Sequence, residues 1–174
     1  MEFRFETDYD RKGLTVLCRA LRLSVRKKHS RRVHIFGWCV VVLGILMIAL
    51  SLTNQEPWSL PNTITGAAVL VLLIVLFRED QLNAWISRRN LLPGTEHAVS
   101  VFGPEGYVST TAAAVSEFHY DAIQCVCETP DHFVLFLGKR HGRLFDKSSL
   151  TGGTVEEFRI FITEKTGKPI THIK

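Results

Sequence analysis

The sequence predicts a membrane α-helical hairpin followed by a small cytosolic α+β domain, and three observations support this fold class. Apolar residues concentrate in 33–77, where the 174-residue chain has one acidic residue, one His and no Lys or Arg. Basic residues flank this stretch, with ten Lys and Arg in 1–32 and three in 78–90. Short strand-like runs and one amphipathic helix fill the remainder. This pattern excludes a uniformly soluble domain, a disordered chain and a disulfide scaffold.

Two apolar segments have the length of transmembrane helices. Residues 33–52 form the first, because twenty helical residues extend about 30 Å, the thickness of the hydrocarbon core. Residues 60–77 are predicted to form the second, although a run this short also suits a buried helix of a soluble protein. A short external loop, 53–59, joins them. Trp58 and Trp85 are expected near the outer and inner membrane interfaces, where Trp is enriched.

The distribution of basic residues predicts the orientation of the hairpin. Lys and Arg are enriched in the cytoplasmic segments of membrane proteins, and the loop 53–59 contains neither. We therefore expect both termini in the cytoplasm and the lipid bilayer around the hairpin. Five basic side chains are expected at the inner membrane surface, close to anionic lipid headgroups: Arg26, Lys27, Lys28, Arg31 and Arg32.

The N-terminal arm, 1–32, is predicted to form a strand and a basic amphipathic helix. Aromatic and charged residues alternate over 2–6, which is typical of a strand. Thr7 and Asp10 resemble a capping box, so a helix is expected over 8–30. The apolar stripe of this helix comprises Leu14, Leu17, Cys18, Leu21 and Val25. Two interpretations fit the stripe equally well: the helix lies in the membrane interface, or it packs on the C-terminal domain.

Residues 94–174 are predicted to form the α+β domain, joined to the hairpin by a helical extension over 78–93. The run 133–137 is almost entirely apolar, so it is expected to be a central strand. The strands are expected at 96–102, 107–111, 115–119, 123–129, 133–137 and 143–146, the last of these ending the sheet. Alternation places three side chains on one face of the fourth strand: Ile123, Cys125 and Cys127.

One amphipathic helix is predicted to close the chain. Thr154 and Glu157 form a capping box at its start, and Gly167, followed by Pro169, ends it. Gly152-Gly153 is interpreted as a flexible cap, because the pair lacks the spacing of a phosphate loop. Strands followed by a single helix indicate a small sheet, or a partly open barrel plugged by that helix. The apolar face of the helix comprises Val155, Phe158, Phe161 and Ile162.

The sequence offers little chemistry for catalysis. Cys125 and Cys127, with His119 and His132 nearby in sequence, lack the usual spacing and second ligand pair of a zinc site. No serine-nucleophile motif and no phosphate-binding loop is present. We therefore expect no catalytic residues, no metal, no cofactor and no enzyme activity.

One basic turn is a candidate contact for a protein partner or a lipid headgroup. Lys139, Arg140 and Arg143 belong to the sequence Lys-Arg-His-Gly-Arg, although a solvated hairpin tip accounts for the same run. Residues 91–174 carry eight Lys and Arg against ten Asp and Glu. Nucleic-acid binding by this domain is therefore not expected.

Several short motifs of the C-terminal domain resemble a known family. They are Tyr-Asp-Ala-Ile (120–123), Cys-Glu-Thr (127–129), the apolar strand 133–137, Phe-Asp-Lys (145–147) and Glu-Glu-Phe-Arg (156–159). Together with Thr-Asp-Tyr-Asp (7–10) and the two spans, these motifs resemble the YcxB-like membrane proteins of bacteria. The resemblance implies a bacterial inner membrane protein whose C-terminal domain is an antiparallel, partly open, pleckstrin-homology-like barrel capped by a helix. It implies no catalytic signature.

The expected function is a binding or regulatory module that is presented at the inner membrane face to an unknown protein or lipid partner. The alternative is a self-protection protein that blocks a membrane-acting toxin or bacteriocin from within the bilayer. The sequence leaves the partner and the oligomeric state open.

Overall fold

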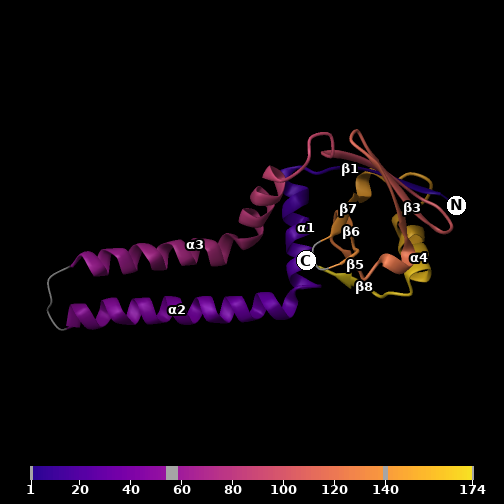
Figure 1. The fold of residues 1–174 in the computed structure, drawn as a ribbon. Coiled ribbons are helices and arrows are strands. Elements are labelled where there is room, and N and C mark those ends of the chain that lie inside the picture. The colour runs from indigo at the N-terminus through magenta and orange to yellow at the C-terminus, as the bar shows by residue number, and fades with distance from the viewer. Residues whose placement is uncertain (1, 54–58, 139–140, 174) are drawn as a thin grey trace. The chain divides into compact units, whose positions relative to one another are not determined.

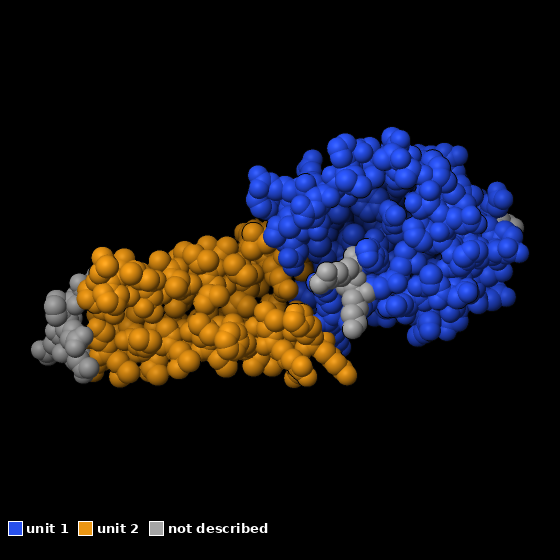
Figure 2. Space-filling view, in the orientation of Figure 1, with its two compact units in different colours: residues 1–27, 83–174 blue, residues 28–82 orange. Residues whose placement is uncertain are grey.

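The computed structural model describes residues 2–53, 59–138 and 141–173. The chain divides into two compact units (Figures 1 and 2): one comprises residues 1–27 and 83–174, and the other comprises residues 28–82. The first unit therefore combines segments from both ends of the sequence. We refer to it as the α+β unit and to residues 28–82 as the hairpin unit.

The hairpin unit contains most of two long helices, α2 (Lys27–Thr53) and α3 (Leu60–Arg89). Residues 83–89 of α3 belong to the α+β unit. Both helices are long and apolar enough to cross a membrane. Their apolar side chains are mostly exposed, with only 11% of the most apolar window buried in α2 and none in α3. The central helix of a soluble protein would bury this surface. Helix α2 begins earlier and ends one residue later than the predicted span 33–52, whereas α3 begins at the predicted residue and continues into the predicted extension 78–93. The backbone of α3 leaves helical geometry at Arg78.

Small residues let the two helices of the hairpin approach closely. Gly37 and Gly44 are two of the buried residues of α2. A Cβ at Gly37 would meet Leu76, and one at Gly44 would come within 2.6 Å of Val69. Small residues at contact points are the usual means by which apolar helices pack in lipid. His34 Nε2 lies 2.6 Å from Glu79 Oε2, so a hydrogen bond joins the two helices near the predicted inner end.

Two four-stranded sheets form the frame of the α+β unit. The first has the order β1 (Phe3–Asp8), β2 (His97–Phe102), β3 (Gly106–Thr111) and β4 (Val115–His119), and all its pairs are antiparallel. The second has the order β7 (Gly142–Asp146), β6 (His132–Phe136), β5 (Cys125–Glu128) and β8 (Ile170–His172). Only β5 and β8 are parallel. The sheets do not join into a closed barrel.

The N-terminal strand is part of the first sheet rather than a separate arm (Figure 1). Phe3 pairs with Phe102 and Phe5 with Ser100 in the register of β1 and β2. Residues of β1 alternate strictly between buried and exposed, as expected for a strand with one face on the core. If the chain were divided at the predicted boundaries, residues 32 and 94, β1 would be separated from β2, the strand to which it is hydrogen-bonded.

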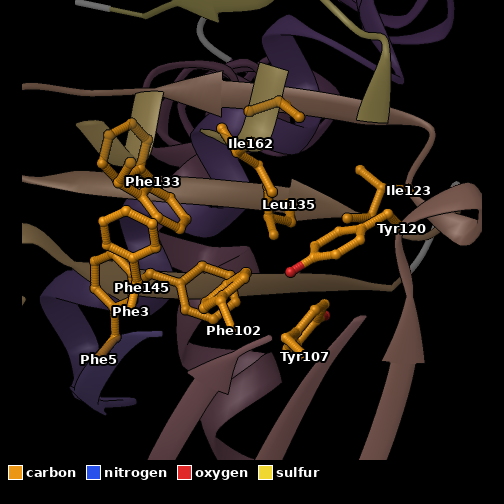
Figure 3. Close-up of a cluster of buried hydrophobic side chains, with 12 residues drawn as sticks. Phe3, Phe5, Phe102, Tyr107, Tyr120, Ile123, Phe133, Leu135, Phe145 and Ile162 are labelled. Atoms are coloured by element: carbon orange, nitrogen blue, oxygen red, sulfur yellow. The ribbon is translucent and has the colours of Figure 1, made fainter. Parts of the chain in front are cut away.

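Helix α4 (Val155–Thr166) closes the aromatic core between the sheets. Thr154 and Glu157 form the predicted capping box, and Gly167 ends the helix with φ +62°. Phe158 and Ile162 are fully buried, which confirms the predicted apolar face. Figure 3 shows the rings of Phe3, Phe5, Phe102, Phe133 and Phe145 gathered in this core.

The helix predicted over 8–30 is shorter and begins differently. Helix α1 spans Arg11–Leu23, and Asp10 caps it by accepting a hydrogen bond from the Gly13 amide. The predicted capping role of Thr7 is wrong, because its hydroxyl accepts a hydrogen bond from the Asp146 amide. The helix stops because Ser24 leaves helical geometry and its hydroxyl donates to the Ala20 carbonyl.

The apolar stripe of α1 packs on the second sheet. Leu14 is buried in a core cluster with Val134, Phe136 and Leu144, and the remaining stripe residues lie against the same cluster. This contact confirms the second of the two interpretations, in which α1 covers the α+β domain.

Three predictions for residues 94–174 are wrong: two concern strands and one concerns Gly152. Residues 143–146 do not form the last strand, because β8 follows α4 and pairs with β5. Ile123 precedes β5 and belongs to the aromatic core, whereas Cys125 and Cys127 face the α1 cluster. Gly152 is not a flexible cap: it has φ +89°, and a Cβ there would lie 2.0 Å from the Glu2 carbonyl oxygen. The chain passes β1 too closely for any side chain.

Candidate functional site

A stack of four side chains leads from the aromatic core to the side chain of Arg143. Phe102 and Tyr107 are stacked with ring centroids 4.8 Å apart, and Tyr107 and Phe118 are stacked at 5.0 Å. The strand register produces this ladder, because Phe102 pairs with Tyr107 and Tyr107 pairs with Phe118. The guanidinium of Arg143 lies over the ring of Phe118, 5.3 Å from its centroid. A cation–π contact of this kind favours this position of the guanidinium.

Arg143 lines a pocket of about 530 Å³ on the α+β unit. Helix α1 contributes Leu17 and Leu21, while Phe136 and Leu137 come from β6 and the residue after it. The volume lies in the range of small-molecule sites. Most of the remaining lining is small or polar: Cys18, Ser87, Ala122, His141 and Gly142.

No acidic residue in the described part of the chain neutralises the charge of Arg143. Among the described residues, no carboxylate forms an ion pair with its guanidinium. His141, immediately before β7, is exposed and also lines the pocket. The pocket thus presents a positioned, permanently protonated cation beside an apolar wall.

Two buried tyrosines lie on the core side of this site. Tyr107 is fully buried, and its hydroxyl has no hydrogen-bond partner within the described chain. Burial raises the pKa of Tyr107 well above its ordinary value, and the charge of Arg143 opposes this shift. Tyr120 differs because its hydroxyl donates to the carbonyl oxygens of Gly103 and Gly106. Burial raises the pKa of Tyr120 to about 12. Both phenols therefore remain neutral at physiological pH.

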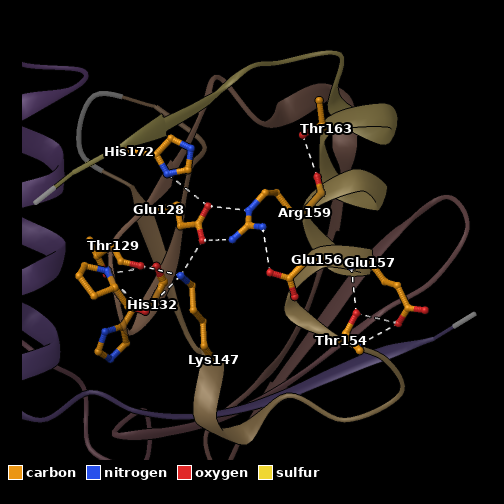
Figure 4. A network of polar contacts seen from close by, with 11 residues as sticks. Glu128, Thr129, His132, Lys147, Thr154, Glu156, Glu157, Arg159, Thr163 and His172 are labelled. Atoms are coloured by element: carbon orange, nitrogen blue, oxygen red, sulfur yellow. Dashed lines mark hydrogen bonds and ion pairs between the residues drawn. The ribbon is translucent and has the colours of Figure 1, made fainter.

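A second polar cluster surrounds the buried carboxylate of Glu128 (Figure 4). Arg159 on α4 donates to both carboxylate oxygens, at 3.0 and 2.7 Å. Lys147 donates to Oε1 at 2.6 Å and to the carbonyl oxygen of Thr129 at 2.6 Å. His172 on β8 lies 3.5 Å from the other oxygen. The cluster joins side chains from β5, α4 and β8 and so holds these elements together. We refer to it as the Glu128 lock.

We expect this lock to make the α+β unit sensitive to acid. Hydrogen bonds from Arg159 and Lys147 lower the pKa of Glu128 to about 2. The stabilisation is complete above the ordinary glutamate pKa and is lost as the pH falls towards 2. It amounts to about 3 kcal/mol. Urea unfolding at pH 5 and pH 2.5, followed by near-ultraviolet circular dichroism, measures this loss.

Glu128→Gln supplies the comparison for the acid effect. This variant should be less stable at pH 5 and should lose much less stability on acidification than the native chain. Glu156→Gln is the matched control, because Glu156 contacts the same Arg159 but its side chain is 73% exposed. Equal pH dependence in the native chain and Glu128→Gln would contradict the assignment of the lock to Glu128.

The two cysteines of β5 form a close thiol pair. Their sulfur atoms are 3.6 Å apart, with Cys127 buried and Cys125 partly exposed. The contact with Cys127 lowers the pKa of Cys125 to about 6, and the same contact with burial raises that of Cys127. Within the described ranges, no group of three or more metal-ligating side chains is assembled. That the pair binds no metal stays a prediction.

The structure separates the predicted site residues. Arg143 lines the pocket, whereas Trp58, Lys139 and Arg140 lie outside the described residues. Trp85 is half-exposed on α3, with the guanidinium of Arg89 4.3 Å from its ring centroid. The five basic residues expected at the membrane surface are all exposed: Arg26, Lys27, Lys28, Arg31 and Arg32.

Sequence reasoning missed the aromatic ladder and the Glu128 cluster. Both depend on registers between strands, which no local pattern provides. One signal was present for Glu128: an acidic residue ends the apolar run Cys-Val-Cys-Glu, where a buried charge needs partners. For the pocket, the sequence showed an aromatic residue in each of three successive strands, Phe102, Tyr107 and Phe118, but their alignment is given only by the register of the sheet.

Fold and site together define a class: a small α+β protein with a cationic pocket, joined to two helices long and apolar enough to span a membrane. Residues 102–162 match the family model of YcxB-like protein. Over these residues the chain is similar to YcxB-like proteins, which supports the family resemblance for this part of the α+β unit. The match runs from the end of β2 into α4 and includes Arg143 and Glu128. No curated protein and no solved structure matches the chain.

Proposed function

We propose that this protein is a non-enzymatic binding module anchored in the bacterial inner membrane. The hairpin unit spans the bilayer with both termini in the cytoplasm, and the α+β unit, a pleckstrin-homology-like domain, faces the cytoplasm. The exposed apolar surfaces of α2 and α3 support the membrane location, because soluble monomers rarely expose so large an apolar area to water.

The observation that carries the binding function is the guanidinium of Arg143, which has no acidic partner among the described residues. The aromatic ladder fixes its position, and α1 supplies an apolar wall beside it. A guanidinium donates hydrogen bonds and keeps its proton at all physiological pH values. Such a group suits the recognition of an anion better than the transfer of a proton or an acyl group. This supports a binding role over a catalytic one.

We expect the topology to follow the positive-inside rule. A reporter that is active only in the cytoplasm should be active when fused after Lys174 and inactive when inserted at residue 56. A periplasm-specific reporter at the same two positions is the control and should give the reverse pattern. Activity of the cytoplasmic reporter at residue 56 would contradict the orientation.

A photo-crosslinking experiment in cells tests the binding role itself. A photoreactive amino acid is placed at position 141 on the pocket rim or at position 46 on the exposed face of α2. A binding module should give a discrete adduct from position 141, and this adduct should survive replacement of 33–77 by an unrelated helical hairpin of equal length. Position 46 should give only lipid adducts.

The same experiment separates the two functions considered for this chain. A self-protection protein would recognise a membrane-inserted toxin by helix packing. It should therefore give a discrete protein adduct from position 46, in the presence of the toxin, and lose it after the hairpin replacement. Loss of the position 141 adduct in a replaced protein that is still inserted and folded would contradict the binding-module proposal.

A further inference from the structure

The pocket beside Arg143 has the features of a site for a single-chain acid. Its wall carries the alkyl side chains of Leu17, Leu21 and Leu137 and the ring of Phe136. Its charged group is one guanidinium without an acidic partner among the described residues. An apolar wall with a single cation is complementary to an apolar chain that ends in one negative charge.

We propose that this pocket binds a fatty-acid-like carboxylate, with its headgroup on Arg143 and its alkyl chain along α1 and β6. A guanidinium pairs with a carboxylate through two parallel hydrogen bonds. The single negative charge of the carboxylate then balances the single positive charge of Arg143. The inference rests on the proposed binding function and names its ligand class.

The geometry around Arg143 favours this occupant over a small inorganic anion. The guanidinium carbon lies over the ring of Phe118, 5.3 Å from its centroid, so the ring covers one side of the group. Its hydrogen-bond donors lie at the edge of the planar group, and a ligand can approach them in that plane. The cavity of about 530 Å³ is far larger than one small anion needs. The remaining volume has an apolar wall, so an alkyl chain gains free energy by filling it.

The test uses the full chain in nanodiscs of zwitterionic lipid and a photoreactive decanoic acid that carries a diazirine on its chain. After irradiation, mass spectrometry should find the label on peptides that contain Leu17 or Phe136. Arg143→Gln should reduce this labelling by about 10- to 100-fold, the range for loss of a charged hydrogen bond. Arg143→Lys should retain part of it. Ala122→Trp should block it, because an indole at this exposed position enters the cavity.

Arg19→Gln is the matched control, since it removes the same charge from an exposed position of α1 outside the pocket lining. It should leave the labelling unchanged. A diazirine-bearing decanol should show no dependence on Arg143. Hydrogen exchange of the β6 amides should be the same in all variants, which demonstrates that the α+β unit remains folded.

Three results would overturn the inference. Equal labelling of native protein and Arg143→Gln would show that the guanidinium does not hold the headgroup. Stronger competition by decyl phosphate than by decanoate would assign the pocket to a phosphate headgroup. Labelling confined to α2 and α3 would show that the acid only partitions into the bilayer, and it would leave the proposed membrane anchorage intact.

Discussion

Phe158→Ala should destabilise the α+β unit by about 3–5 kcal/mol, the usual range for a buried Phe. Phe158 is fully buried, and its ring centroid lies 4.7–5.4 Å from those of Phe3, Phe5, Phe102 and Phe133. Rigid β-strands carry these four rings, so the cavity cannot collapse easily. Hydrogen exchange of the β6 amides should accelerate by roughly a hundred- to several-thousand-fold.

Ile160→Ala provides the comparison on the same helix. Ile160 is 68% exposed, so its truncation should change the same exchange rates by less than about threefold. If Phe158→Ala had no greater effect than Ile160→Ala, α4 would not close the core as described.

Deletion of residues 2–8 should have a still larger effect and leave the α+β unit unfolded. It removes β1, and with it the fully buried Phe5 and the almost fully buried Phe3. Phe5 alone contacts the rings of four other core residues. The loss exceeds the effect of one core truncation and approaches the whole stability of a small domain. Limited proteolysis should then cut within 97–172, a region in which we expect the native unit to resist cleavage.

Arg4→Gln with Glu6→Gln is the control for the deletion. These side chains lie on the exposed face of β1 and pair with each other at 2.7 Å, so removal of their charges should cost less than about 1 kcal/mol. Resistance to proteolysis in the deletion variant would mean that residues 97–172 form an independent domain without β1.

Local sequence patterns predicted the helices and strands of this chain better than they predicted which strands pair with each other. The capping box at Thr154 and Glu157 and the glycine at position 167 mark the ends of α4, because these signals act within one helical turn. The centre of the second sheet was also predictable, since the run 133–137 has no polar face. By contrast, β8 is three residues long and mostly exposed, so its sequence carries no periodic signal.

The assembly of the α+β unit was less predictable because it joins residues far apart in the sequence. Alternation identified the strand near the N-terminus but not its partner β2, which lies beyond the entire hairpin. The candidate site was difficult to predict for the same reason, because it also depends on how distant strands pair. Arg143 was identified as one member of a basic run, whereas its place over Phe118 depends on the alignment of three strands.

The pairing of β1 with β2 sets an order of events during synthesis. Asp8 is the register partner of His97, so the first strand leaves the ribosome 89 residues before its neighbour begins. During that interval both apolar helices must be made. Closure of so long a loop is slow, and the unpaired edge of β1 is prone to aggregation until β2 has been made. The core of the α+β unit is therefore completed only after the hairpin segment has been made, and a nascent chain arrested within the hairpin exposes Phe3 and Phe5 to cellular quality control.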